Sequence, residues 1–467
     1  MASPVLAIPQ ALVNLVQTGL LERAFHDSLY PALLFRSEAM AEEWPGHIGT
    51  QVFESRASLL TPVTTPLQPG VDPQPQTLQY EQWVVNIQRY GSAMDTHLPT
   101  SFYSNADQFM RNLQQFGLQA AQSVNQISRN ALFQAYLSGQ TLSTVAGLST
   151  DTQIQVASVN GFIDVVLTGT QVRPVAVSAQ YPLPISIVLA PNNIISVNVI
   201  GYTLNNMSDP SSPGVLLLSA ALGQAVPIRT PVLSSVAPTV IRAGGGNSVD
   251  AITSGDTATL QDFFNAVSVL RQNNVQPHED GFYHAHLPPN VSAQLMSDRA
   301  IQNLFTANPD HAAMKTGFIG QIANIKFYMN AESPNTLNTG LQTATTSAGS
   351  QYAFGIGAET INYSGVYISR TIVTGRGHLY ERWVDEDKFV NGDVGVTGKI
   401  GQFDVVNQSI RIQTDRVRLV IRSPIDRFQD VLSSAWSISA AWPVPSDVTS
   451  NSGSQRFKRA VVVESAT

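Results

Sequence analysis

The chain has 467 residues, of which 43% are hydrophobic and 13% are charged, with no cysteine and a formal net charge of −7. The absence of cysteine excludes disulfides and thiolate metal sites, and the negative charge argues against tight sequence-independent binding of nucleic acid. The charged fraction is about half of the ~25% usual in soluble proteins, so we expect a surface of Gln, Asn, Ser and Thr that can be buried against other subunits.

An ordinary secreted β-rich protein would have a similar composition, but the N-terminus does not favour secretion. It has no basic region before its apolar residues, and its first cation is Arg23. No stretch reaches the ~18 uninterrupted apolar residues that span a bilayer, so we expect no membrane partner. Residues 9 to about 43 have apolar side chains at helical spacing and predict one or two short amphipathic helices, interrupted near Pro31.

A β-hairpin is predicted next, with one arm in residues 48–60 and the other in 78–90. Its tip, residues 61–76, contains five prolines: Pro62, Pro66, Pro69, Pro73 and Pro75. Proline removes backbone donors and stiffens an extended chain, so this tip cannot join the interior of a sheet and should project. A disordered linker between domains is an equally good interpretation of the tip alone.

The clearest helix in the sequence follows. Ser104 to Asp107 resembles a capping box, and Gly139 is a suitable terminator. Between them, apolar residues recur every three or four positions and form one stripe: Ala106, Phe109, Leu113, Phe116, Ala120, Val124, Ile127 and Ala131. About 35 residues at ~1.5 Å each predict a rod near 50 Å long, which needs a long surface such as a sheet to lie on.

The rest of the chain is predicted to be mostly β structure with a mixed segment in the middle. Short Val/Ile/Leu runs separated by Pro, Gly and Asn predict an all-β module over residues 150–250, closed by a flexible glycine joint at 242–247. Helices are predicted from Thr259 to about Arg271 and from about Ser292 to Phe305, with a strand in 281–290 between them and a strand pair in 317–330. From about residue 365 onward, alternation predicts strands again, most clearly at 417–421 and 436–442.

Motifs for catalysis or cofactor binding are absent or incomplete. Residues 392–400 resemble a phosphate-binding loop but hold Asp393 and Ile400 where Gly and Ser or Thr are needed. His284 and His286 share one face of a strand near His278 and could bind a metal, but no third ligand has a recognised spacing. The acidic residues from Tyr380 to Asp387 are interpreted as solvated loops or contacts to basic partners. We therefore predict no enzyme activity, no cofactor and no metal.

The order of these elements resembles the HK97-fold capsid subunit of tailed bacteriophages. Residues 78–140 are similar to the hairpin return strand and long helix of coat proteins related to phages N4 and P22. Residues 240–298 are similar to their A-domain entry, although Leu287 interrupts the His-Pro pattern of GFYHAHLPPN. The stretch GFIGQIANIKFYMN, 317–330, is similar to the strand that follows.

The resemblance implies an α+β fold with six parts. These are an N-terminal arm (1–47), an E-loop hairpin (48–100), a spine helix of the P-domain (101–149), an inserted β-rich domain (150–245), an A-domain (246–364), and P-domain strands with the C-terminus (365–467). The expected contacts to neighbouring subunits lie on the hairpin, at Arg56, Pro62, Pro66, Pro69, Pro73, Pro75 and Trp83.

The function that the resemblance implies is that of a major capsid protein, which assembles as pentamers and hexamers into an icosahedral shell around phage DNA in the host cytoplasm. Some members weld neighbours through a lysine on the E-loop, but residues 48–98 contain no lysine, so the contacts are expected to be non-covalent. The hairpin begins too early for a fused scaffold, which implies a separate scaffolding protein, and a portal protein is a further expected partner. An encapsulin-like compartment and a secreted β-rich adhesin or glycan-active protein are the alternatives.

Overall fold

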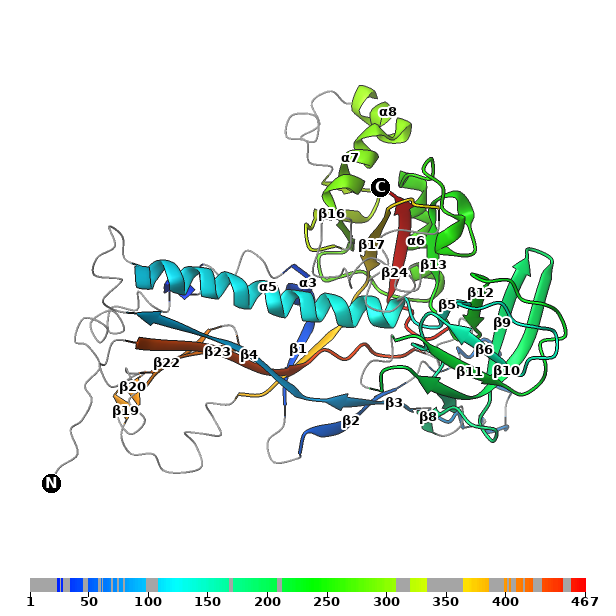
Figure 1. Cartoon of the computed structure of the whole chain (residues 1–467), viewed down its shortest axis with the longest axis horizontal. Helices are drawn as coiled ribbons and strands as arrows, with labels where there is room; N and C mark the ends of the chain where they lie inside the picture. Colours follow the sequence, from blue (N-terminus) through cyan, green and yellow to red (C-terminus); the bar gives the residue numbers. More distant parts are fainter. Residues whose placement is uncertain are drawn as a thin grey trace. The chain divides into compact units, whose positions relative to one another are not determined.

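The structure is a computed structural model (Figure 1). It describes residues 23–25, 27, 34–44, 49–57, 60, 62–68, 70–73, 75–78, 80–97, 108–167, 171–207, 212–307, 320–333, 364–385, 399–400, 403–404, 409–414, 416–422, 431–447 and 455–467. The chain forms two compact units. Unit 1 comprises Met1–Val52, Val84–Arg129 and Leu379–Pro443, and unit 2 comprises Phe53–Trp83, Asn130–His378 and Val444–Thr467. Among the described residues, no helix combines the length and apolar character that crossing a bilayer requires.

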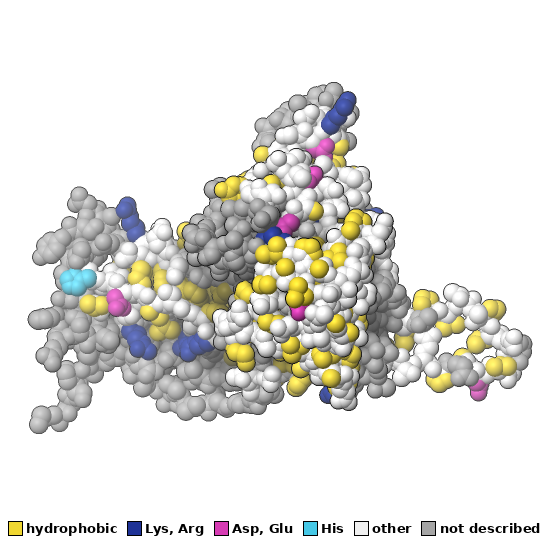
Figure 2. Space-filling view, turned by 45° about the vertical axis from the view of Figure 1, so that its right-hand side comes forward, with side chains coloured by type: hydrophobic (Ala, Val, Ile, Leu, Met, Phe, Trp, Pro, Cys, Tyr) yellow, Lys and Arg dark blue, Asp and Glu magenta, His cyan; other side chains and the backbone are white. Residues whose placement is uncertain are grey.

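Charged side chains are sparse on the face of the molecule shown in Figure 2, where most of the surface is hydrophobic or uncharged polar. Part of the small set of charged residues lies inside the protein instead. The buried charged residues in the described part of the chain are Arg36, Glu81, Arg129, Arg370, Glu381, Asp447, Lys458 and Glu464. Since charged groups are rarely buried unless they are paired, their placement is a strong constraint on the fold.

Unit 1 is built on an eight-stranded sheet. Its strands, in spatial order, are β1 (Met40–Glu43), β18 (Tyr380–Trp383), β23 (Val431–Ala441), β22 (Val417–Arg422), β21 (Ser409–Thr414), β20 (Phe403–Asp404) and β19 (Lys399–Ile400), and β4 (Gln88–His97) also pairs with β23. The predicted alternation is confirmed, because every second side chain of β22 and β23 is buried. The side chains packed inward include Val417, Leu419 and Trp436.

The long helix α5 (Gln108–Tyr136) is confirmed, with 29 residues; the predicted start at Ser104 lies outside the described residues. In unit 1 the indole N–H of Trp436 on β23 donates to Gln119 Oε1 on the helix at 3.0 Å, so the helix does lie on a sheet. Gly139 ends the helical region with a positive φ of 70°, as predicted. Ile127 and Ala131 are only partly buried, whereas Leu132, Phe133 and Tyr136 are fully buried, because the last turns belong to unit 2.

The segment before β1 corrects the helix prediction for residues 9–43. Residues 23–25 and 27 and the short helix α3 (Leu34–Ser37) are helical, but residues 40–43 form β1, which pairs in parallel with β18. A buried ion triad holds α3 in place: Glu381 accepts from Arg36 Nη2 at 2.8 Å and from Arg416 Nη1 at 2.6 Å. Glu381 is 0% exposed, so of the two interpretations of these acidic residues the solvated loop is wrong for Glu381, which instead contacts arginines of its own chain.

In unit 2, residues 140–234 contain a six-stranded antiparallel sheet. Its order is β5 (Gln140–Leu142), β12 (Pro231–Ser234), β9 (Leu183–Ala190), β10 (Asn193–Leu204), β11 (Gly214–Leu218) and β6 (Gln153–Val156). The outer strands meet, because Ala157 N–H donates to Leu142 O at 3.0 Å and Ser143 pairs with Val156. The sheet therefore closes into a barrel around apolar side chains that include Ile187, Val199 and Leu216.

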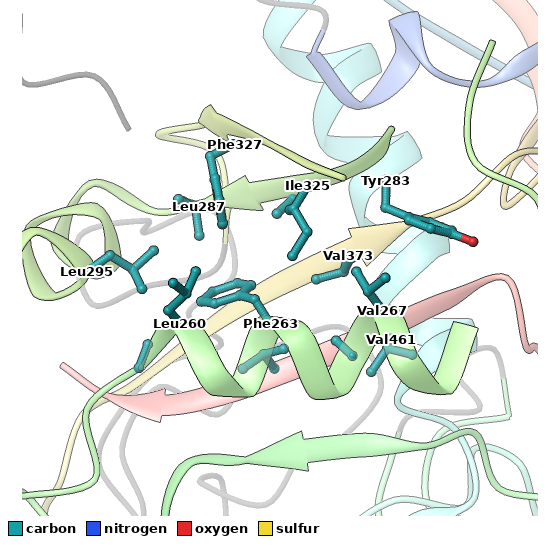
Figure 3. Packing of buried hydrophobic residues seen from close by; sticks show 14 of the residues in the cluster. Leu260, Phe263, Val267, Tyr283, Leu287, Leu295, Ile325, Phe327, Val373 and Val461 are labelled. Carbon is teal, nitrogen blue, oxygen red and sulfur yellow. The ribbon is translucent and has the colours of Figure 1, made fainter. Parts of the chain in front are cut away.

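A second six-stranded sheet of unit 2 runs in the order β13 (Val240–Arg242), β24 (Ala460–Ala466), β17 (Ile368–Thr374), β14 (Tyr283–Leu287), β16 (Ile325–Met329) and β15 (Gln321–Ile322). Helix α6 (Leu260–Gln272) packs against it, and Figure 3 shows Val267 beside Val373 and Val461 of the sheet, with Leu260 at the other end of the helix near Leu287 and Leu295. The predicted strand in 281–290, the strand pair in 317–330 and the helix from Thr259 are confirmed; Thr259 and Asp262 form a capping box.

The single helix predicted from Ser292 to Phe305 is wrong, because two helices occupy this region: α7 (Pro289–Ser297) and α8 (Arg299–Ala307). Asp298 between them has an extended ψ of 128°. Its carboxylate accepts from the Leu260 N–H at 2.7 Å and from the Ala300 N–H at 3.0 Å. An Asp that satisfies helix N-terminal donors in this way breaks the helix at its own position.

A second ion triad crosses this sheet. Glu464 on β24 accepts from Arg242 Nε on β13 and from Arg370 Nε on β17, both at 2.8 Å. Arg242 also lies just before the glycine run at 244–246, where Gly244 and Gly245 have positive φ angles of 78° and 76°. The predicted joint is thus a defined turn anchored by an ion pair.

A further sheet has four strands, which in spatial order are β2 (Gln51–Ala57), β3 (Tyr80–Asn86), β8 (Gln171–Ala176) and β7 (Asp164–Leu167).

Replacing Glu381 with Gln should destabilise unit 1 strongly. Removal of the carboxylate leaves two guanidinium groups without their counter-charge, and breaking a buried pair from one side costs about 3–5 kcal/mol. We expect a corresponding fall in the urea midpoint of the unassembled chain. The control is Glu42→Gln, which removes the Glu42–Arg382 ion pair between β1 and β18; its partly exposed carboxylate should be worth less than ~1 kcal/mol. Equal effects would contradict a special role for the triad.

Replacing Gly161 with Ala should destabilise the junction between α5 and the barrel. Gly161 has a φ of 82°, and an added Cβ would lie 2.1 Å from the backbone nitrogen of Gly139. Gly223 has a similar φ of 73° but open space around it, so Gly223→Ala reports the conformational strain alone, about 1–2 kcal/mol. Gly161→Ala should cost about 1–3 kcal/mol more because of the clash, measured by thermal unfolding. Equal losses would show that the two backbones do not meet.

Candidate functional site: an uncharged hairpin loop with a charged base

Residues 53–83 of unit 2, called the hairpin loop below, expose an unusual amount of apolar surface. The structure describes fourteen large hydrophobic side chains as exposed, and six of them lie here: Phe53, Leu60, Val63, Leu67, Val71 and Tyr80. Four of these are more than 55% exposed. From residue 57 to residue 80 the only charged side chain is Asp72. Figure 2 shows this segment as the narrow loop at the right, with hydrophobic side chains along it.

The described prolines of the tip lie outside helices and strands, as the sequence predicts. Pro62, Pro66, Pro73 and Pro75 are all exposed and lie in backbone that is neither helix nor strand, while Pro69 lies outside the described residues. The Val71 N–H donates to Gln68 O at 3.2 Å, next to Gly70 at a φ of 81°. The tip therefore turns at residues 68–71, and it presents prolines and apolar side chains without strand pairing.

The two other predicted contact residues, Trp83 and Arg56, lie on the arms. Trp83 on β3 is half-buried, and its indole N–H is buried without a hydrogen-bond partner. Arg56 on β2 is directed toward the protein, where its Nη1 lies 3.1 Å from Asp447 Oδ1. The prediction that Arg56 contacts a neighbouring subunit stays untested, but within the chain it already forms an ion pair.

Asp447 lies at the centre of the charged group at the base of the hairpin loop. Arg459 Nε contacts both of its oxygens, at 3.1 and 3.3 Å, and the Arg459 Nη1 group donates to Arg376 O at 2.8 Å. Lys458 and Glu81 are buried nearby, at 2% and 3% exposure. Both arms of the loop, through Arg56 and Glu81, therefore reach the charges of the C-terminal segment.

The electrostatics of this group are dominated by burial. Burial raises the pKa of the Asp447 carboxyl to about 6, although the positive charges of Arg56 and Lys458 oppose the rise. Burial lowers the pKa of Lys458, opposed by Asp447 and Glu81. The pKa of Tyr136, whose hydroxyl donates to His378 O at 3.1 Å, is raised by burial and by the charge of Asp447. The pKa of the Asp447 carboxyl is thus raised toward neutral pH.

Sequence reasoning found the exposed part of this site and missed its base. One signal was available: Glu81 shares its strand face with Trp83 and Val85, and Val85 is 1% exposed, so strand alternation places a carboxylate on a buried face. No comparable pattern marks Asp447 or Lys458, which acquire their surroundings only through contacts distant in the sequence.

The histidines singled out in the sequence also lie in unit 2. His284 and His286 are buried on β14, and His284 Nε2 lies 2.9 Å from Asp280 Oδ2. The ring of His278 stacks on that of His284 at 4.1 Å, and Tyr328 packs against both strand histidines. The two strand histidines thus pack against aromatic rings, and His284 is also paired with a carboxylate. Most of the loop at 392–400 lies outside the described residues.

The raised pKa of Asp447 predicts how stability depends on pH. Because the folded-state value of about 6 exceeds the ~3.9 of an unfolded chain, the folded state binds the proton more tightly. The contribution of this group is complete below pH ~4 and is lost as the pH rises through 6, a change of about 3 kcal/mol. In urea unfolding between pH 4 and 8, Asp447→Asn should remove this part of the pH dependence and should be no less stable than the parent at pH 8.

The control for this experiment is Asp72→Asn, in the exposed tip of the loop, which should keep the parent profile. A variant at position 447 whose stability falls in parallel with the parent at every pH would contradict the assignment.

We compared the chain with known proteins by sequence and by structure. No protein-family model matches the chain, and no curated protein matches it. Among solved structures, the chain is similar to the capsid of the cyanophage P-SCSP1u (12% identity, TM-score 0.46, covering 93% of this chain and 89% of that one). It is also similar to the capsids of Ralstonia phage GP4 (11%, 0.45, 94% and 92%) and cyanophage Pam1 (9%, 0.48, 92% and 89%). The chain is thus similar to capsid proteins of bacteriophages, the class that its sequence resembles.

Proposed function

We propose that this chain is the coat subunit of a bacteriophage shell and that the hairpin loop lies on a neighbouring copy within it. The observation that carries the proposal is the concentration of exposed apolar side chains on a proline-stiffened loop whose residues 57–80 carry a single charge. A contiguous apolar surface of this kind on a soluble protein marks a contact site. Burial of one such side chain contributes about 1.5–3 kcal/mol, so several together are sufficient for a specific contact.

A second copy is the partner that fits the distribution of charge. Residues 57–80 of the loop carry only Asp72, so they offer little charge to attract an acidic or basic partner. The chain has few charged residues and buries some of them, which leaves uncharged polar surface for the loop to contact. Contacts between identical copies repeat around symmetry axes, so each weak contact is multiplied over the shell. The prolines prevent the loop from pairing as an open strand edge, which protects the free subunit from aggregation.

The finer parts of the proposal follow from the resemblance stated for the sequence. The copies would form pentamers and hexamers of an icosahedral shell that encloses double-stranded DNA without reading its sequence, in the cytoplasm of the host. The contacts would be non-covalent, a separate scaffolding protein would guide assembly, and a portal protein would occupy one vertex. The role is structural and not catalytic.

Two charges placed in the hairpin loop should block assembly and leave the subunit folded. Val63 and Leu67 are 71% and 70% exposed, so Val63→Asp with Leu67→Asp should not change the unfolding midpoint of the unassembled chain. Burial of a carboxylate at a subunit contact costs more than the apolar contact contributed, and even ~1.4 kcal/mol per contact lowers its equilibrium constant tenfold. We expect shells, counted by electron microscopy after co-expression with the scaffolding protein, to fall at least tenfold.

The control is Met207→Asp, which places one such carboxylate at a side chain that is 86% exposed outside the loop. It should assemble as the parent does. The proposal fails if the double variant forms shells at the parental yield, or if the parent remains monomeric at high concentration with its scaffolding protein present.

A further inference from the structure

We propose that Asp447 is a proton-dependent tie at the base of the hairpin loop: as a carboxylate it holds Arg56 of strand β2, and when protonated it releases that strand. The significance of the tie for assembly rests on the function proposed above, whereas the tie itself is a property of the single subunit. It would give the loop two states of attachment that differ by one proton.

The geometry gives Asp447 two partners with different roles. Arg56 lies on an arm of the loop and contacts one carboxylate oxygen, Oδ1, at 3.1 Å. Arg459 belongs to the same C-terminal segment as Asp447 and contacts both oxygens, while its own Nη1 is held by Arg376 O. When Arg56 leaves, Arg459 still positions the Asp447 side chain, so release of the arm does not require the C-terminal segment to unfold.

The charges around Asp447 make the attachment of Arg56 depend on whether Asp447 is ionised. Arg56 approaches from β2, Glu81 from β3, Tyr136 from α5, and Lys458 and Arg459 from the C-terminal segment. Arg456 is paired with Asp164, at 2.6 and 2.7 Å, and also interacts electrostatically with Glu81. Asp447 is the carboxylate that contacts Arg56, and protonation removes its negative charge. Protonation therefore leaves Arg56 beside two other cations with less negative charge to hold it.

Linkage fixes the direction of the effect. The positive charge of Arg56 lowers the pKa of Asp447, so attachment of Arg56 and binding of a proton oppose each other, and acid must weaken the attachment. This local effect differs in sign from the effect on global stability. Burial of Asp447 favours the proton and stabilises the folded chain in acid, but the hold on the arm is present above pH 6 and is lost below it.

Trypsin cleavage after Arg56 tests the tie in the unassembled chain at pH 8. Residues 48–98 contain no lysine and only two arginines, Arg56 and Arg89, and Arg89 lies on β4 of unit 1, so it serves as an internal reference. Asp447→Asn, which is neutral at every pH, should increase cleavage after Arg56 at least tenfold and leave cleavage after Arg89 unchanged. Equal rates at Arg56 in variant and parent would overturn the proposal, as would a parallel rise at both sites, which indicates general loosening.

Hydrogen exchange provides a second measurement that does not depend on one variant. After correction for intrinsic rates, the amides of residues 51–57 should lose protection in the parent between pH 7.5 and pH 5. Arg56→Gln and Asp447→Asn should have the low protection at both pH values. A parent whose protection is independent of pH would overturn the tie. Because both measurements use the free subunit, they can fail while shells still form, and they can succeed in a chain that never assembles.

Discussion

The structure depends on carboxylates that are held between two guanidinium groups. Glu381 lies between Arg36 and Arg416, Glu464 between Arg242 and Arg370, and Asp447 between Arg56 and Arg459. In each triad at least one arginine comes from a segment more than 200 residues away from the carboxylate. A buried ion group of this kind adds little net stability, because desolvation offsets the attraction, but a chain that mispairs its segments leaves a charge buried without a partner. The triads therefore penalise arrangements in which these segments do not meet.

The three carboxylates do not share one electrostatic environment. The two arginines around Glu464 overcome the effect of its burial and lower its pKa, whereas burial dominates at Asp447 and raises it. The Glu464 triad joins three strands of one sheet, and its carboxylate keeps its charge. The group at the base of the hairpin loop ties a projecting segment and can lose its charge under mild conditions. A carboxylate between two arginines can thus form either an ion group that stays charged, as at Glu464, or one that loses its charge on mild acidification, as at Asp447.

Sequence patterns predicted the elements of this fold better than their partners. Alternation in β22 and β23, the capping box at Thr259 and the terminator Gly139 each reflect a local rule, and the structure contains all three. The parallel pairing of β1 with β18 and the closure of the barrel between β5 and β6 could not be predicted. Periodicity indicates which face of a strand is buried, but it does not indicate the neighbouring strand.

The candidate site likewise has a part that the sequence predicted, the exposed loop, and a part that it did not, the ionic contacts at the base. Exposure of the prolines and apolar side chains of the hairpin loop follows from composition, because such a segment cannot enter a sheet. The ionic role of Arg56 depends on Asp447, almost 400 residues further along the chain, and Glu381 appeared solvated because its arginine partners are also remote. A charged residue gains its meaning from tertiary contacts, which a single sequence does not display.

The strand order has a consequence for how the polypeptide folds as it is synthesised. Strand β23 pairs with β4 at the other end of the sequence, and β24 lies between β13 and β17. Neither large sheet can therefore be completed until the final hundred residues have left the ribosome. Until then, β4, β13 and β17 lack the strands with which they pair, so their apolar faces remain uncovered. Pairings of such long sequence separation form slowly. The barrel, contained within residues 140–234, needs no late strand and can form while translation continues.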